Sequence, residues 1–256
     1  MKRVSIIGTG NVATHLATAL RASGVTINQV FGRNQNNLNS LAKKVSANPI
    51  SSLLELDTEN VDAIIISVKD DVIEEVANQL TTSNAIFAHT SGTVGIEALK
   101  NHQNRGVFYP LQTFSKSKEM DLSDIPFCIE GNDRSTKLSL LNLATVLSND
   151  VRFVDSNTRK SLHIAAVFAS NFSNHMLAIS DKLLKESGQD LSILKPLVTE
   201  TISKAFSSNP VQSQTGPAVR DDQEVIQHHL AQLENEPLQK DIYALISESI
   251  KQFKNE

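Results

Sequence analysis

The sequence predicts an α/β protein, with a doubly wound parallel sheet over residues 1–154 and a smaller all-helical domain over residues 155–256. In the first part, short apolar runs alternate with stretches of helical character, which is the rhythm of βαβ units. Eight of the ten glycines lie within the first 131 residues, so the chain turns often there and seldom afterwards. After residue 155 no convincing strand pattern is found.

The expected elements follow this rhythm. Strands are expected at 4–7, 27–31, 63–68, 85–88, 106–109, 127–130 and 151–154, and helices at 11–23, 71–80 and about 134–147. Residues 156–187 contain no Gly or Pro, which predicts a helix of roughly 30 residues and about 45 Å. Proline-containing breaks then separate three further helices, at about 190–207, 221–233 and 237–253.

Composition narrows the class of protein. With 40% hydrophobic and 20% charged residues the chain is expected to be globular. Its 24 basic and 28 acidic residues give a net charge of −4, so neither nucleic acid nor a membrane surface is an expected partner. Without a secretory signal or a run approaching the roughly 18 apolar residues that span a bilayer, it is expected to be cytoplasmic. The single Cys128 cannot form an internal disulfide, and no metal site is expected.

The first chemical motif directly follows the first expected strand. It has the form G-x-G-x-x-A and comprises Gly8, Thr9, Gly10, Asn11, Val12 and Ala13. The first glycine permits a tight turn, the second lets the backbone approach a pyrophosphate, and Ala13 allows close helix packing. At the start of a βαβ pattern, this motif indicates a Rossmann-like dinucleotide site at the N-terminus of the following helix.

The second expected strand ends at Arg33 and Asn34, where an NAD-selective enzyme would place an acidic residue against the adenosine ribose. No acid precedes Glu55, and the first 54 residues carry a charge of +6. Arg33 is suited to a 2′-phosphate and Asn34 offers a neutral donor, so the expected cofactor is NADP.

Two later strand ends complete the expected crevice. Ser67 and Val68 follow one strand, and a His-Thr-Ser-Gly segment at 89–92 follows the next. Because ligands of such sheets bind outside the carboxyl ends of the strands, Ser67, Val68 and His89 are assigned to the cofactor. The adjoining Ser91 and Gly92 are assigned to the substrate. The alternative interpretation is an ordinary polar turn.

Polar residues gather on one face of the long helix. At 100° per residue, Lys160, His163, Asn171 and Asn174 fall within an arc of about 80°. Lys160 is the candidate proton donor, with His163 and Asn171 orienting the substrate and Asn174 binding it. The alternative is a solvated Lys160 with the two Asn residues bridging to another helix.

These segments together resemble a family of oxidoreductases that join a Rossmann-like domain to a helical domain of unassigned function. The resemblance rests on the glycine motif and on five other segments, at 31–34, 89–92, 109–112, 163–172 and 215–220. That family is in turn similar to pyrroline-5-carboxylate reductases, prephenate dehydrogenases and 6-phosphogluconate-type dehydrogenases. The last group has a Lys-x-x-His-Asn signature, which Lys160 and His163 match, while Ile164 stands where its Asn would be.

The helix expected at 156–187 is too long, and around Val167 too apolar, for one small domain to cover, which predicts a homodimer built on the helical domain. The resemblance implies the same dimer, with Arg220 available for a substrate carboxylate. It also implies hydride transfer to a C=O or C=N bond of a small carboxylic acid. The sequence therefore predicts an NADP-dependent oxidoreductase. The competing interpretation is a non-catalytic NADP-binding sensor or scaffold.

Overall fold

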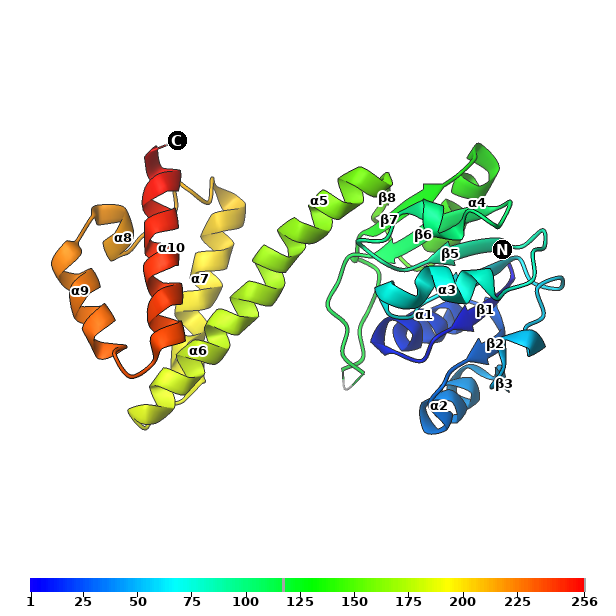
Figure 1. The fold of residues 1–256 in the computed structure, drawn as a ribbon, viewed down its shortest axis with the longest axis horizontal. Helices are drawn as coiled ribbons and strands as arrows, with labels where there is room; N and C mark the ends of the chain where they lie inside the picture. Colours follow the sequence, from blue (N-terminus) through cyan, green and yellow to red (C-terminus); the bar gives the residue numbers. More distant parts are fainter. Residues whose placement is uncertain (117, 256) are drawn as a thin grey trace. The chain divides into compact units, whose positions relative to one another are not determined.

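The computed structural model describes residues 1–116 and 118–255. The chain divides into two compact units, Met1–Ser170 and Asn171–Glu256 (Figure 1). This division places residues 155–170 with the first unit, and a functional boundary after residue 154 stays a prediction.

The first unit is built on one eight-stranded sheet. Its strands are β1 (Arg3–Ile7), β2 (Thr26–Phe31), β3 (Asn48–Ile50), β4 (Ala63–Ile66), β5 (Ile86–His89), β6 (Arg105–Pro110), β7 (Phe127–Gly131) and β8 (Val151–Phe153). Its α-helices are α1 (Asn11–Ala22), α2 (Gln35–Val45), α3 (Ile73–Asn78), α4 (Arg134–Ala144) and α5 (Ser156–Ala166). Short 3-10 turns are η1 (Leu53–Glu55), η2 (Asp70–Val72) and η3 (Ile96–Leu99).

The strand order is β3-β2-β1-β4-β5-β6-β7-β8, which confirms the doubly wound, Rossmann-like class. All seven expected strands are present, whereas α2 and β3 lie outside the elements expected from the sequence. β3 has three residues at the sheet edge, and only four residues of the Asn-rich α2 are buried. The hydrophobic sequence pattern of both elements is therefore weaker than that of the central strands.

The last two strands depart from the expected parallel sheet. β7 pairs antiparallel with β6, with Tyr109 opposite Cys128, and β8 is parallel to β7, so both run opposite to the other six strands. Parallel neighbours require a long crossover, but antiparallel neighbours can be joined without a helix. The segment between β6 and β7 is irregular where the structure describes it, at 111–116 and 118–126.

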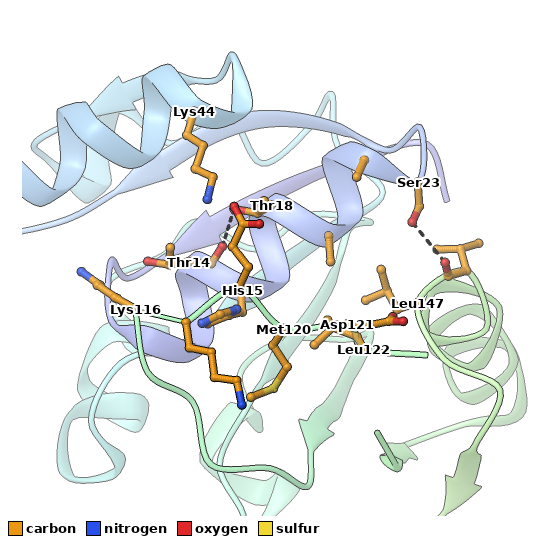
Figure 2. Close-up of a pocket in the computed structure, with 15 residues that line it drawn as sticks. Thr14, His15, Thr18, Ser23, Lys44, Lys116, Met120, Asp121, Leu122 and Leu147 are labelled. Atoms are coloured by element: carbon orange, nitrogen blue, oxygen red, sulfur yellow. Dashed lines mark hydrogen bonds between the residues drawn. The ribbon is translucent and has the colours of Figure 1, made fainter. Parts of the chain in front are cut away.

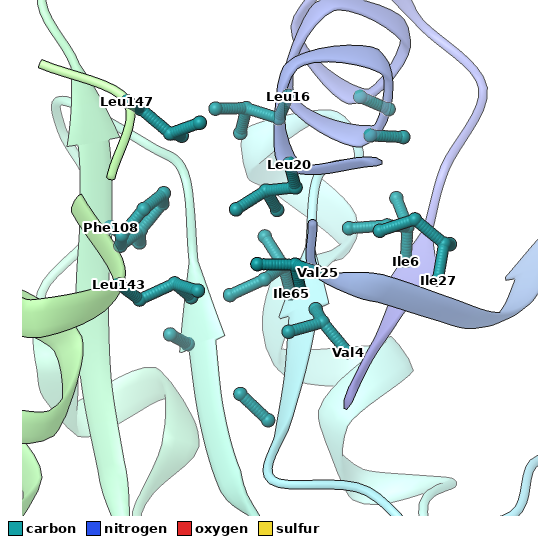
Figure 3. Close-up of a cluster of buried hydrophobic side chains, with 14 of the residues drawn as sticks. Val4, Ile6, Leu16, Leu20, Val25, Ile27, Ile65, Phe108, Leu143 and Leu147 are labelled. Carbon is teal, nitrogen blue, oxygen red and sulfur yellow. The ribbon is translucent and has the colours of Figure 1, made fainter. Parts of the chain in front are cut away.

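Side chains alternate across the sheet and fill a layer on each face. Val4 and Ile6 of β1 point into the larger layer, which the buried faces of α1, α2 and α4 complete (Figure 3). Ile7 points into the other layer, beside Ile73 of α3. Burial of each large aliphatic side chain contributes about 1.5–3 kcal/mol, so these two layers fix the strand ends that carry the site.

The helical stretch expected at 156–187 is present but not uniform. A π-helix, η4 (Val167–Phe172), separates α5 from α6 (Ser173–Glu186). Its i→i+5 bonding adds a residue to the turn, so the constant 100° spacing assumed for residues 160–174 is wrong. The predicted single face of Lys160, His163, Asn171 and Asn174 does not follow from this backbone.

In the part of the second unit that the structure describes, all regular secondary-structure elements are helices. They are α6, η5 (Leu191–Leu194), α7 (Lys195–Ser207), α8 (Pro217–Arg220), α9 (Gln223–Gln232) and α10 (Pro237–Asn255). No helix within 1–116 or 118–255 combines the length and apolarity needed to cross a membrane.

Candidate functional site

A cavity of about 740 Å³ opens at the carboxyl ends of the central strands. The strand order reverses between β1 and β4, and such a switch point is where doubly wound sheets bind ligands. The lining residues come from the ends of β1, β2, β4, β5 and β6, from the segments that follow them, and from α5. They are Gly8–Val12, Phe31–Asn34, Asn37, Ser67–Asp70, Thr90–Gly92, Tyr109, Lys116 and His163.

The two glycines in the turn between β1 and α1 are required for different physical reasons. Gly8 has φ +122°, and a Cβ there would lie 2.0 Å from the carbonyl oxygen of Ser67. Protein packing alone therefore requires glycine at position 8. Gly10 has an ordinary φ of −74°, and a Cβ there would meet no protein atom within 4 Å. Neither strain nor packing explains Gly10, so the space beside its backbone is open to a ligand.

The first turn of α1 has no side-chain cap and no acidic residue. The first amides of a helix lack intrahelical acceptors and carry a positive partial charge, which together attract phosphate. The open space at Gly10 and these amides fit the pyrophosphate of a dinucleotide.

The end of β2 brings Arg33 and Asn34 to the same cavity. Gly32 before them packs against Thr9, whose Cγ2 would lie 2.5 Å from a Cβ at position 32. The Asn34 side-chain oxygen accepts the backbone N–H of Asn37 at 2.9 Å and thereby caps α2. Arg33 is exposed and forms no salt bridge with any described residue. Its guanidinium is thus available to an anion.

His89 lies beneath the cavity and does not line it. Its Nδ1 accepts the backbone N–H of Ser91 at 3.2 Å, which leaves the proton on Nε2, facing the Gly95 carbonyl oxygen at 3.4 Å. Burial, together with the Arg159 charge, lowers the pKa of His89 to about 4. The neutral ring therefore holds the loop at 89–95.

The Ser91 hydroxyl is used within the same loop. Its oxygen accepts the backbone N–H groups of Thr93 and Val94, both at 3.0 Å. The Thr93 hydroxyl in turn donates to the carboxylate of Asp70. Ser91 is 5% exposed, so its side chain shapes the cavity wall, and its neighbour Gly92 is likewise a buried lining residue.

Tyr109 and His163 form a hydrogen-bonded pair at the cavity. Tyr109 Oη lies 3.1 Å from His163 Nδ1, although 54 residues separate them in sequence. Burial raises the pKa of Tyr109 to about 12, so the phenol keeps its proton at neutral pH. A Cβ at Gly92 would lie 2.5 Å from His163 Nδ1, so only glycine leaves room for this ring. The phenol can donate to Nδ1, which places the imidazole proton on Nε2.

A buried ion pair fixes the start of α5 against the loop at 89–96. Arg159 is fully buried, and its Nη1 donates to Glu130 Oε2 at 2.5 Å. Its Nη2 donates to the carbonyl oxygen of Val94 at 2.6 Å. Ser156 joins them, because its hydroxyl donates to Glu130 at 2.8 Å and accepts the Ile96 N–H at 3.1 Å. This network sets the position of His163 one turn further along α5.

The remaining predicted residues lie elsewhere. Lys160 is exposed on α5 and does not line the cavity. Asn171, Asn174 and Arg220 are exposed residues of the second unit, where Arg220 Nη2 lies 3.8 Å from the Asp222 carboxylate. Their roles stay predictions.

The structure also adds residues that the sequence did not single out. In the sequence, the only indication that Arg159 has a special role is weak: it is a cation near the start of a helix, where the helix dipole disfavours positive charge. Asp70 at the start of η2 is most simply an N-terminal cap in sequence, and Lys116 had no signal at all.

Two family models match the chain. Residues 3–88 match a domain described as NADP oxidoreductase, coenzyme F420-dependent. Residues 125–250 match DUF2520, a domain of unknown function. Among curated proteins none matches significantly.

Solved structures similar to this chain cover nearly its full length. The provisionally named NADP oxidoreductase BF3122 from Bacteroides fragilis is 38% identical, with a TM-score of 0.91 and 98% of each chain covered. Protein TM1727 from Thermotoga maritima is 23% identical, with a TM-score of 0.82, covering 99% of this chain and 100% of that one. A 1-pyrroline-5-carboxylate reductase from Streptococcus pyogenes is 16% identical, with a TM-score of 0.62 and coverage of 99% and 98%. The last two share the fold.

Proposed function

We propose that this chain, which belongs to the family of NADP oxidoreductases with a C-terminal DUF2520 domain, transfers hydride from NADPH to a C=O or C=N bond of a small carboxylic acid. One observation carries the proposal. A single cavity joins an uncapped helix N-terminus, an unpaired arginine and a hydrogen-bonded Tyr–His pair. The first two suit a phosphorylated dinucleotide and the third suits proton transfer, so the arrangement favours an enzyme over a passive binding module.

The cofactor half of the site divides among three strand ends. The backbone from Gly8 to Val12 receives the pyrophosphate, and Arg33 pairs with the 2′-phosphate. Asn34 is available through its amide NH₂ group, because its oxygen caps α2. Ser67 and Val68, at the end of β4, wall the nicotinamide end. When bound, NADPH supplies the hydride.

The proton comes from His163 in this proposal. Hydride addition to a carbonyl carbon leaves a negative charge on the oxygen, and the imidazolium form of His163 protonates that oxygen from Nε2 and is left as the neutral ring. Tyr109 holds the ring from Nδ1 and satisfies the hydrogen bond there. His163 is preferred to Lys160 as the donor because His163 lines the cavity and Lys160 does not. His89 acts from beneath the cavity as a positioning residue.

The acid group of the substrate is assigned to the cavity wall at Gly92, since the Ser91 hydroxyl is engaged within its own loop. Arg220, Asn171 and Asn174 stay as proposed contributors from the second unit. The structurally similar 1-pyrroline-5-carboxylate reductase is named for its substrate, a small cyclic imine acid. That name supports a small carboxylic acid with a C=N bond as a substrate class here.

The cofactor preference can be tested without a substrate. An arginine–phosphate hydrogen-bonded pair contributes about 1.5–3 kcal/mol, or roughly tenfold to over a hundredfold in affinity. Arg33→Asp should therefore weaken NADPH binding by about that factor and leave NADH binding nearly unchanged. Titration calorimetry at low salt measures both. Equal wild-type dissociation constants for NADPH and NADH would contradict the assignment.

The second unit is proposed to form a homodimer. Its only buried hydrophobic residues among those described are Ala218 and Ile226, and α6 and α7 have none. Large apolar side chains are instead exposed, with Phe206 at 90% and Leu245 at 72%. A small helical unit without a core of its own needs a partner surface, and extended exposed apolar patches mark such interfaces.

Analytical ultracentrifugation at micromolar protein should give about twice the chain mass of 28.0 kDa. Leu245→Glu places a charge on the exposed apolar surface and should shift the mass toward the monomer, whereas Leu245→Met should remain dimeric. A monomeric wild type would refute the dimer.

A further inference from the structure

The segment at 111–116 leaves β6 and lies against the first turns of α1. The Asn11 side-chain Nδ2 donates to the carbonyl oxygen of Phe114 at 2.8 Å. One turn later, His15 Nε2 lies 2.9 Å from the Ser115 carbonyl oxygen, and its ring packs on Phe114 with centroids 5.2 Å apart. Three contacts thus hold two consecutive residues of this segment on the helix that follows the glycine motif.

These contacts place Lys116 at the border of two cavities. It lines the cofactor cavity together with Arg33 and the turn at Gly10, and it also lines a second cavity of about 460 Å³ beside α1. Figure 2 shows the second cavity, where the Lys116 side chain points away from the apolar end formed by Met120 and Leu122. Its amine is therefore directed away from apolar surroundings.

No carboxylate that the structure describes neutralises the charge of Lys116. It forms no salt bridge with any of them, although acidic residues occur three and more positions further along the same connection. Of the described residues that line the cofactor cavity, Asp70 is the one acid, and it accepts a hydrogen bond from Thr93. Arg33, Lys69 and Lys116 are cationic, so the cavity carries an excess of positive charge suited to an anion with several phosphates.

We propose that Lys116 is a phosphate-binding residue for the dinucleotide, reaching it from the connection between β6 and β7. The inference rests on the proposed function, because it requires a dinucleotide in this cavity. Its ammonium acts as a point charge against either the 2′-phosphate or the pyrophosphate. Asn11 and His15 act as positioning residues, because they hold the backbone before Lys116 on α1.

The test compares two lysines on the same connection. Lys116→Gln removes the charge at the cofactor cavity, while Lys118→Gln removes one that lines only the second cavity. Binding of NADPH and NADH is titrated for both variants, for Lys116→Arg and for the wild type. We expect Lys116→Gln to weaken NADPH binding about tenfold at low salt, and less at high salt. Lys118→Gln should remain within about twofold of wild type, and Lys116→Arg should retain most of the affinity.

The two cofactors identify the phosphate. A loss confined to NADPH assigns Lys116 to the 2′-phosphate, and an equal loss for NADH assigns it to the pyrophosphate. Unchanged binding of both by Lys116→Gln, or equal losses in the two glutamine variants, overturns the inference but leaves the proposed function intact. Failure of the wild type to bind either dinucleotide overturns both.

Discussion

Replacing His163 with alanine should lower the turnover of a 2-oxo acid substrate by about a hundredfold to ten-thousandfold, the range expected for loss of general-acid catalysis. The dissociation constant of NADPH should change little, because His163 adjoins Tyr109 and Gly92 and not the phosphate-binding turn. The alanine variant also removes the partner of a buried phenol, so its thermal stability is measured alongside its kinetics.

Two further variants separate His163 from its neighbours. Lys160→Met should be nearly fully active, since Lys160 is exposed and does not line the cavity. Tyr109→Phe keeps the ring but removes the hydrogen bond to Nδ1, so its loss should be smaller than that of His163→Ala. A fully active His163→Ala together with an inactive Lys160→Met would return the proton donor to Lys160. The substrate for these assays is sought by following NADPH oxidation with 2-oxo and imino acids.

The fold class was predictable because the apolar runs at β1, β4 and β5 are buried on both faces. The reversed direction of β7, which β8 shares, was not predictable, because the composition of a buried strand is the same in a parallel or antiparallel pair. The π-helix at Val167–Phe172 was missed as well, since no glycine or proline marks it.

The candidate site was predictable only where the residues that form it lie close together in sequence. Gly8 and Gly10 lie two positions apart in sequence, and both line the cavity as expected. His89 also lies at the end of a strand, yet its side chain is buried. The rule that ligands bind at strand ends locates the end of the strand, but it does not say which side chain there turns toward the ligand. The pairs Tyr109–His163 and Glu130–Arg159 depend on α5 packing against distant strands, which a single sequence does not reveal.

The proposed function requires a dinucleotide at the turn between β1 and α1, and Gly10 offers a substitution that acts on the ligand alone. Its φ of −74° is accessible to any residue, and a Cβ there meets no protein atom within 4 Å. Gly10→Val should therefore fold with nearly the stability of the wild type. The added side chain would occupy the space that the pyrophosphate needs against the backbone, so NADPH affinity should fall at least about a hundredfold.

Gly8→Val is the matched control for folding, because a Cβ at that position would lie 2.0 Å from the Ser67 carbonyl oxygen and should destabilise the protein itself. The decisive measurement is a calorimetric titration of NADPH into wild type and Gly10→Val, each shown by thermal unfolding to be folded. We expect saturable one-site binding to the wild type and none detectable at the same concentrations for Gly10→Val. Equal binding by both proteins would contradict this expectation.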